Sequence, residues 1–219
     1  MTYDLIIVSQ SSGKDLIQLT NNCICTARQD NADLNIIVVE TGHPYKYDVD
    51  KIIEYNGAFN YNRALNLGLK HAKSDVQILA NNDIIFHKGW SKIGDIMRIN
   101  KYLSVCALSN DNRQRGFRRG NFAYEGYMIG REMAGWCIFT DKKLWKIIDK
   151  LDEKYQFWFS DNVYADQLKQ NEIKHALICS IQVDHIGSRT LVRQNRLTQR
   201  QFTDNIERIY RKDSIRLKR

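Results

Sequence analysis

Hydrophobic residues along the chain fall into two patterns, short unbroken runs and stripes with helical spacing. The unbroken runs, several of them rich in β-branched residues, predict buried strands. They cover residues 4–10, 35–41, 51–56, 75–79, 103–109, 133–140 and 175–184. The stripes repeat every three to four positions and predict helices. They cover residues 14–28, 60–73, 87–102, 141–151 and 162–171. Residues 110–125 follow neither pattern, so we expect a loop there.

Buried strands separated by helices predict an α/β fold with a mostly parallel central sheet covered by helices on both faces. Ligands of such sheets bind beyond the carboxyl ends of the strands. Three polar segments fall at that edge: Ser9-Gln10, Glu40-Thr41 and Asn81-Asn82-Asp83. No glycine-rich phosphate loop follows the first strand, which disfavours dinucleotide binding and P-loop phosphotransfer.

The triplet Asn81-Asn82-Asp83 allows two interpretations. Amide and carboxylate oxygens at a sheet edge are suitable ligands for a divalent cation. The same residues also favour a simple turn after a strand, because their side chains hydrogen-bond to the nearby backbone. The triplet alone does not separate the two.

The net charge predicts the class of binding partner, and the cysteines predict the cellular compartment. The 219 residues carry a formal net charge of +8, which predicts anionic partners such as nucleic acid, anionic lipid or phosphorylated substrates. Residues 189–219 hold ten basic and three acidic side chains, a net charge of +7. Five scattered cysteines predict free thiols in a reducing cytoplasm. We expect neither a signal peptide nor a transmembrane segment, because no basic leader and no apolar run of about 18–20 residues is present.

Five motifs occur in a recognisable order. The segment FNYNRALNLG at residues 59–68 precedes Asn81-Asn82-Asp83, and Gly135-Trp136 precedes an apolar strand. The aromatic segment FWFSD at residues 157–161 and His185 follow. This order resembles the GT-A glycosyltransferases of the family 2 type, with residues 59–68 similar to the F-N-x-x-[RK]-A-x-N-x-G helix and the asparagine-rich triplet in the place of the D-x-D motif.

The resemblance covers about residues 4–190 and implies a domain organisation. We expect a single Rossmann-like GT-A catalytic domain at residues 1–190. Its nucleotide-sugar half would span about residues 1–110 and its acceptor half about residues 111–190. Residues 191–219 would form a basic helical tail.

The resemblance also implies an inverting, metal-assisted transfer of a sugar from a nucleotide-diphosphate sugar, with a UDP-sugar favoured, to an acceptor hydroxyl. Asp161 would be the general base, and Asp83 and His185 would hold Mn²⁺ or Mg²⁺. The implied nucleotide-sugar-binding residues are Ser9, Glu40, Arg63, Asn81, Asn82 and Asp83. The chain departs from the family in having one acid in the triplet and Ser160 before Asp161, where the family usually has an acid.

We expect the acceptor to be polyanionic, because clustered cations with interleaved aromatics suit a phosphate backbone. The predicted acceptor-binding residues are Trp136, Trp158, Arg113, Arg115, Arg118 and Arg119. DNA with a hydroxymethylated base, as glucosylated by bacteriophage enzymes, is the favoured acceptor, and the host cytoplasm is then the compartment. The alternatives are a lipid-linked or cell-envelope glycan acceptor, a nucleotidyltransferase, and a non-catalytic nucleic-acid-binding protein.

Structural roles compete with each of these assignments. Asp161 could cap the helix that follows it. His185 could be a structural histidine, and Glu40 an ordinary acid at a strand end. Trp136 and Trp158 could be core residues.

Overall fold

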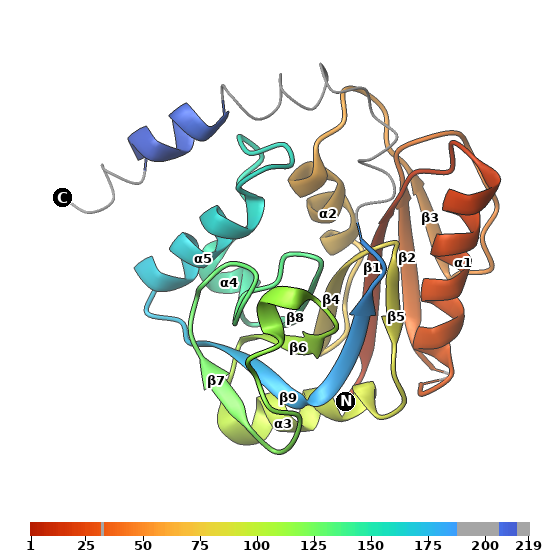
Figure 1. Cartoon of the computed structure of the whole chain (residues 1–219). Helices are drawn as coiled ribbons and strands as arrows, with labels where there is room; N and C mark the ends of the chain where they lie inside the picture. Colours follow the sequence, from red (N-terminus) through yellow and green to blue (C-terminus); the bar gives the residue numbers. More distant parts are fainter. Residues whose placement is uncertain (32, 188–205, 214–219) are drawn as a thin grey trace.

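The central sheet contains nine strands in the computed structural model, which describes residues 1–31, 33–187 and 206–213 (Figure 1). One half is parallel, in the order β3 (Lys51–Glu54), β2 (Asn35–Glu40), β1 (Tyr3–Ser9) and β4 (Val76–Asn81). Every residue of β1 is buried, which agrees with a strand covered on both faces.

The other half of the sheet is mixed. β8 (Cys137–Asp141) runs antiparallel between β4 and β6 (Ser104–Ser109). β9 (His175–His185) pairs in parallel with β6 and antiparallel with β5 (Ile84–Phe86) and with β7 (Ala123–Glu125). The expected α/β fold with a mostly parallel central sheet flanked by helices is confirmed, with antiparallel strands added in this half.

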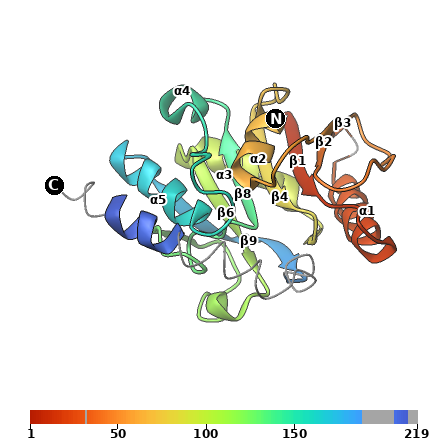
Figure 2. The ribbon, with the colours of Figure 1, turned by 90° about the horizontal axis from the view of Figure 1, so that it is seen from above.

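Helices cover both faces of the parallel half. α1 (Lys14–Arg28) contacts β1 and β5, whereas α2 (Tyr61–Leu69) contacts β1 and β2. Figure 2 shows the two helices on opposite sides of β1. Right-handed crossovers require this arrangement, because α1 leads from β1 towards one edge of the sheet and α2 leads back. Gly68 lets α2 approach β1, since a Cβ there would lie 2.3 Å from the Ile6 side chain.

The remaining helices surround the mixed half. α3 (Ile93–Asn100) follows a 3₁₀ turn at Trp90–Lys92, and α4 (Trp145–Ile148) and α5 (Ser160–Gln170) follow β8. Residues 206–213 form a further helix, which Figure 2 shows beside α5. Among the described residues, no helix has both the length and the hydropathy needed to cross a bilayer.

Several predicted boundaries differ from the structure. The loop expected at 110–125 contains a 3₁₀ turn at Asn112–Gln114 and strand β7, which is too short to show a periodic signal. The helix expected at 141–151 is reduced to α4, because Asp141 still belongs to β8. The expected basic tail at 191–219 is helical at 206–213, and its other residues lie outside the described part of the chain.

Candidate active site

A cleft of about 210 Å³ lies at the carboxyl end of β4, between α2, β8 and the start of α5. Residues from distant parts of the sequence share its wall. They are Tyr61, Asn62, Leu65, Leu79, Asn81, Arg113, Gly135, Trp136, Ile138, Leu151, Phe157, Trp158, Phe159, Ser160, Asp161, Tyr164 and His185. The structure therefore brings six of the predicted site residues together in one cleft: Asn81, Arg113, Trp136, Trp158, Asp161 and His185.

Asp161 lies in the first turn of α5, where its side chain accepts a hydrogen bond from the Asn162 backbone at 3.0 Å; the N-cap of α5 is Phe159, so the capping role considered for Asp161 is not seen. Burial raises the pKa of Asp161, and backbone hydrogen bonds and the positive charge of Arg113 oppose this rise only in part. Gly135 makes room for it, because a Cβ there would lie 2.9 Å from the Asp161 Cβ. The raised pKa of this carboxyl group suits a general base.

Asp83 and His185 face each other beside this cleft. Asp83 Oδ1 and His185 Nε2 lie 3.4 Å apart, and both side chains are largely buried. Within the described residues, neither atom has a partner in hydrogen-bond geometry. Two atoms that each lie about 2.1 Å from one ion can be at most about 4.2 Å apart, so this pair fits a shared divalent cation. No cluster of three or more His, Cys, Asp or Glu residues suitable for a metal occurs in the described part of the chain.

Trp136 holds the His185 ring in place. Its ring stacks on His185 with centroids 5.0 Å apart and an interplanar angle of 7°. The Arg113 guanidinium lies over the same ring at 5.2 Å. The Trp136 ring therefore packs against two side chains of the protein itself. The buried Nε1–H of Trp136 remains without a hydrogen-bond partner among the residues described, although Trp136 lines the cleft.

Three predicted nucleotide-sugar residues lie in a buried hydrogen-bond chain next to the sheet edge. Tyr47 Oη donates to Glu40 Oε2 at 3.1 Å and lies 2.9 Å from Ser9 Oγ. Ser9 Oγ lies 2.9 Å from Thr20 Oγ1, which also accepts from Asn82 Nδ2 at 3.1 Å. This chain joins the ends of β1, β2 and β4.

Glu40 is further engaged by the backbone. Its Oε1 accepts hydrogen bonds from the Ser11 and Gly42 amides at 2.9 and 2.7 Å. These bonds fix the loops that follow β1 and β2. The role of Ser9, Glu40 and Asn82 in nucleotide binding stays a prediction.

The segment from Asp149 to Phe159, called the strap here, forms one wall of the cleft and leads into Asp161. Both end residues have left-handed backbone conformations, with φ of 60° and 64°. Non-glycine residues adopt this conformation at a cost, so the surrounding structure must hold the strap.

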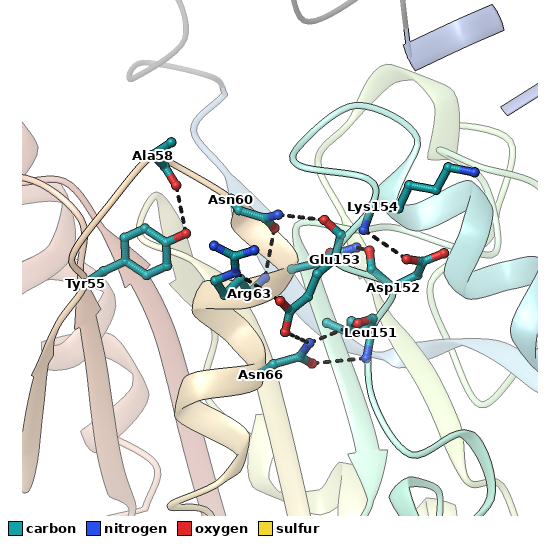
Figure 3. A network of polar contacts seen from close by, with 10 residues as sticks. Tyr55, Ala58, Asn60, Arg63, Asn66, Leu151, Asp152, Glu153 and Lys154 are labelled. Atoms are coloured by element: carbon teal, nitrogen blue, oxygen red, sulfur yellow. Dashed lines mark hydrogen bonds and ion pairs between the residues drawn. The ribbon is translucent and has the colours of Figure 1, made fainter. Parts of the chain in front are cut away.

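Helix α2 binds the strap through three asparagines, as Figure 3 shows in part. Asn60 and Asn62 donate to the carbonyls of Glu153 and Asp152, each at 2.7 Å. Asn66 pairs with Leu151 in both directions, donating to its carbonyl at 2.9 Å and accepting from its amide at 3.0 Å. The asparagines of α2 therefore bind consecutive backbone groups of the strap.

The predicted basic residues other than Arg113 lie away from the cleft wall. Arg63 pairs with Glu153 on the strap at 2.9 Å (Figure 3). Arg115, Arg118 and Arg119 are exposed. Their assignments to phosphate or acceptor binding stay predictions.

Sequence reasoning did not single out Tyr61, which lines the cleft and donates to Asn81 Oδ1 at 2.7 Å. Tyr61 lies inside the segment 59–68, so the motif was its only signal. The strap carbonyls gave no signal at all, because every residue type supplies a carbonyl.

Comparison with known proteins identifies the fold. No protein-family model matches the chain, and no curated sequence is significantly similar to it. A structure of GalNAc-T7 with UDP, GalNAc and Mn²⁺ is similar over 84% of this chain and 44% of that chain, with a TM-score of 0.64 and 11% identity. TarS of S. aureus is similar over 86% of this chain and 37% of that chain, with a TM-score of 0.62 and 12% identity.

The chain thus spans less than half the length of either protein. At these identities the similarity establishes the fold alone, which is GT-A-like.

Proposed function

We propose that the protein is a glycosyltransferase that uses a nucleotide-diphosphate sugar, with a UDP-sugar favoured as donor. One observation carries the proposal: the cleft is lined by a partly buried carboxyl group with a raised pKa, Asp161, and by His185, whose buried Nε2 faces the equally unsatisfied Asp83. An acid–base group and a cation-binding pair at one cleft suit transfer to a hydroxyl group. The GT-A-like fold supports this function by analogy only.

Asp161 accepts the proton of the acceptor hydroxyl in the proposed reaction. As that proton leaves, the hydroxyl oxygen forms a bond to the anomeric carbon of the sugar from the face opposite the diphosphate. The bond between the anomeric carbon and the diphosphate oxygen breaks, and its electron pair stays with the diphosphate. The product has inverted configuration, and one carboxylate is sufficient for the proton transfer.

Asp83 and His185 are the residues that would hold Mn²⁺ or Mg²⁺. A bound divalent cation would neutralise the charge that develops on the diphosphate leaving group. With one carboxylate and one imidazole the protein offers two ligands, so we expect the cation to bind appreciably only together with the diphosphate. The Trp136 ring keeps His185 oriented towards Asp83 by stacking on it.

We further propose a polyanionic acceptor, with DNA carrying a hydroxymethylated base favoured. Arg115, Arg118 and Arg119 are exposed, and the exposed aromatics Phe122 and Tyr124 follow them along the chain. The same segment contributes Arg113 to the cleft. A phosphate backbone could therefore contact this segment while an acceptor hydroxyl reaches Asp161.

Calorimetric titration of nucleotide sugars with and without Mn²⁺ tests the donor part. We expect binding that requires Mn²⁺ and that is lost in Asp83→Ala. Asp184→Asn is the matched control, because this neighbouring carboxylate pairs with His87 at 2.9 Å and does not line the cleft. Equal donor binding by Asp83→Ala and the wild type would overturn the cation site.

Radiolabelled donors then identify the group transferred. We expect transfer of the sugar to an acceptor or to water, and its loss in Asp161→Asn with donor binding intact. Transfer of the nucleotidyl group instead would refute the proposed function.

A further inference from the structure

Helix 206–213 packs against the strap on the segment that leads into Asp161. The Tyr210 ring stacks on Phe159, with centroids 5.0 Å apart and an interplanar angle of 21°. Tyr210 also packs edge-on against Tyr155, with centroids 6.2 Å apart. Both partners belong to the strap, and Phe159 lines the cleft.

Polar contacts fix the same helix at two further points. Asp213 Oδ2 accepts hydrogen bonds from Tyr155 Oη at 2.7 Å and from Lys154 Nζ at 2.5 Å. Tyr210 Oη donates to Asp166 Oδ2 on α5 at 3.0 Å. Burial and the bond to Asp166 raise the pKa of Tyr210 to about 12, so its hydroxyl stays protonated at neutral pH. The helix therefore binds both the strap and α5, which are the two segments that meet at Asp161.

The strap is thus held from two sides. The asparagines of α2 bind the backbone of Leu151, Asp152 and Glu153. Helix 206–213 binds the side chains of Lys154, Tyr155 and Phe159. The second contact acts where the backbone is strained, because Phe159 has φ of 64° directly before α5. A strained conformation persists only when its surroundings enforce it.

We propose that helix 206–213 is an outer clamp on the strap and that Tyr210 and Asp213 are positioning residues for Asp161. They do not touch the substrate. They hold Phe159 in its left-handed conformation, which sets the direction in which α5 starts and hence where the Asp161 carboxyl group lies. The link from the clamp to catalysis rests on the function proposed above for Asp161, whereas the packing of the clamp does not.

Hydrogen–deuterium exchange of the full-length protein tests the clamp without any activity. In Tyr210→Ala we expect the amides of residues 154–163 to exchange faster by at least about 2- to 12-fold, the factor that loss of the Phe159 pair alone implies. Tyr210→Phe keeps the ring and loses the bond to Asp166, so its exchange should lie between that of the wild type and that of Tyr210→Ala. Glu207→Gln is the matched control on the same helix, because Glu207 pairs with Arg211 in the described structure. Unchanged exchange in Tyr210→Ala would overturn the clamp.

Asp213→Asn provides a second and milder variant if Tyr210→Ala fails to fold. It should accelerate exchange of the same amides by a smaller factor, and unchanged exchange in this folded variant would also count against the proposal.

Steady-state kinetics distinguish a clamp that positions Asp161 from a clamp that only stabilises the fold. We expect the clamp variants to lower kcat several-fold and to leave the donor KM within about twofold, because donor binding does not depend on Asp161. An equal change in KM and kcat would contradict the positioning role. If the wild type transfers no sugar, the proposed function fails, while the exchange data still decide whether the clamp exists.

Discussion

Asp161 belongs both to the first turn of α5 and to the wall of the cleft. Its side chain accepts a hydrogen bond from the Asn162 amide inside the first turn of α5, and it also lines the cleft with a raised pKa. The family resemblance implied that Asp161 and His185 belong to one site, and both residues line the same cleft. The internal use of the Glu40 carboxylate was not predictable, because it depends on the folded positions of the Ser11 and Gly42 amides.

The raised pKa of Asp161 gives a signed prediction. The carboxyl group must be ionised to accept a proton, so activity should rise with pH through a pKa above the ordinary value of 3.8. Burial makes the ionised form unfavourable in the folded state, so Asp161 should lower stability once the pH exceeds its unfolded pKa.

Asp161→Asn should therefore lower kcat by about 10²–10⁴-fold and raise Tm at pH 7 but not at pH 3. A pH series of thermal melts and initial rates measures both effects. A variant with wild-type kcat would exclude Asp161 as the base.

Trp136 should contribute a hydrogen bond to the bound donor, because its buried Nε1–H has no partner among the described residues. Trp136→Phe keeps an aromatic ring at this position and removes the indole N–H group. We expect the Kd of the nucleotide sugar to rise about 2- to 12-fold, which corresponds to about 0.5–1.5 kcal/mol. Trp145→Phe is the control, because Trp145 Nε1 is also unpartnered in the described structure but does not line the cleft. Equal Kd values for both variants would contradict this role.

At the scale of elements, the strap and its bonds to α2 form the least predictable part of the site. Strands β1, β2 and β4 follow from their apolar runs and α2 from its stripe at 60–73, and Asn60 caps α2 by accepting from the Arg63 amide at 2.9 Å. The strands β5 and β7 are three residues long, which is too short for a periodic signal. The strap has no periodicity at all, because backbone groups rather than side chains receive the bonds from α2.

Loss of the Asn66 side chain should destabilise the protein more than loss of the Arg63 ion pair. Asn66→Ala leaves the amide and carbonyl of Leu151 without their partner, at a cost of about 1–3 kcal/mol each for a buried group. Arg63 is exposed, so solvent screens its pair with Glu153 and breaking that pair should cost much less. Urea denaturation of Asn66→Ala and Arg63→Ala measures both free energies of unfolding. The reverse order would contradict the structure.

At the scale of the whole molecule, the excess positive charge is concentrated in two segments of the sequence. The arginines between residues 113 and 119 precede β7, and residues 189–219 carry a net charge of +7. The net charge predicted an anionic partner, but it could not predict where that partner binds. The structure adds that one of these arginines, Arg113, reaches the cleft itself.

A polyanionic acceptor predicts steep salt dependence. We expect duplex DNA binding to weaken as salt rises, and Arg118→Ala and Arg119→Ala each to reduce the slope of log K against log salt by about 1. Arg98→Ala is the control, because Arg98 is exposed on α3 and already pairs with Asp95. Filter binding across a salt series, repeated with anionic vesicles, distinguishes the acceptors. Binding to vesicles alone would favour the lipid-linked glycan over DNA.

The binding of the strap by α2 has a consequence for how specificity can change. Asn60, Asn62 and Asn66 bind carbonyl groups of residues 151–153, and any amino acid at those positions offers the same carbonyl. The backbone that leads to the aromatic wall is therefore anchored independently of the side chains at residues 151–153. Directed evolution can therefore vary Phe157 and Trp158 in the cleft wall while the backbone bonds from α2 stay in place, which would make the strap a suitable region for changing the specificity of the proposed transferase.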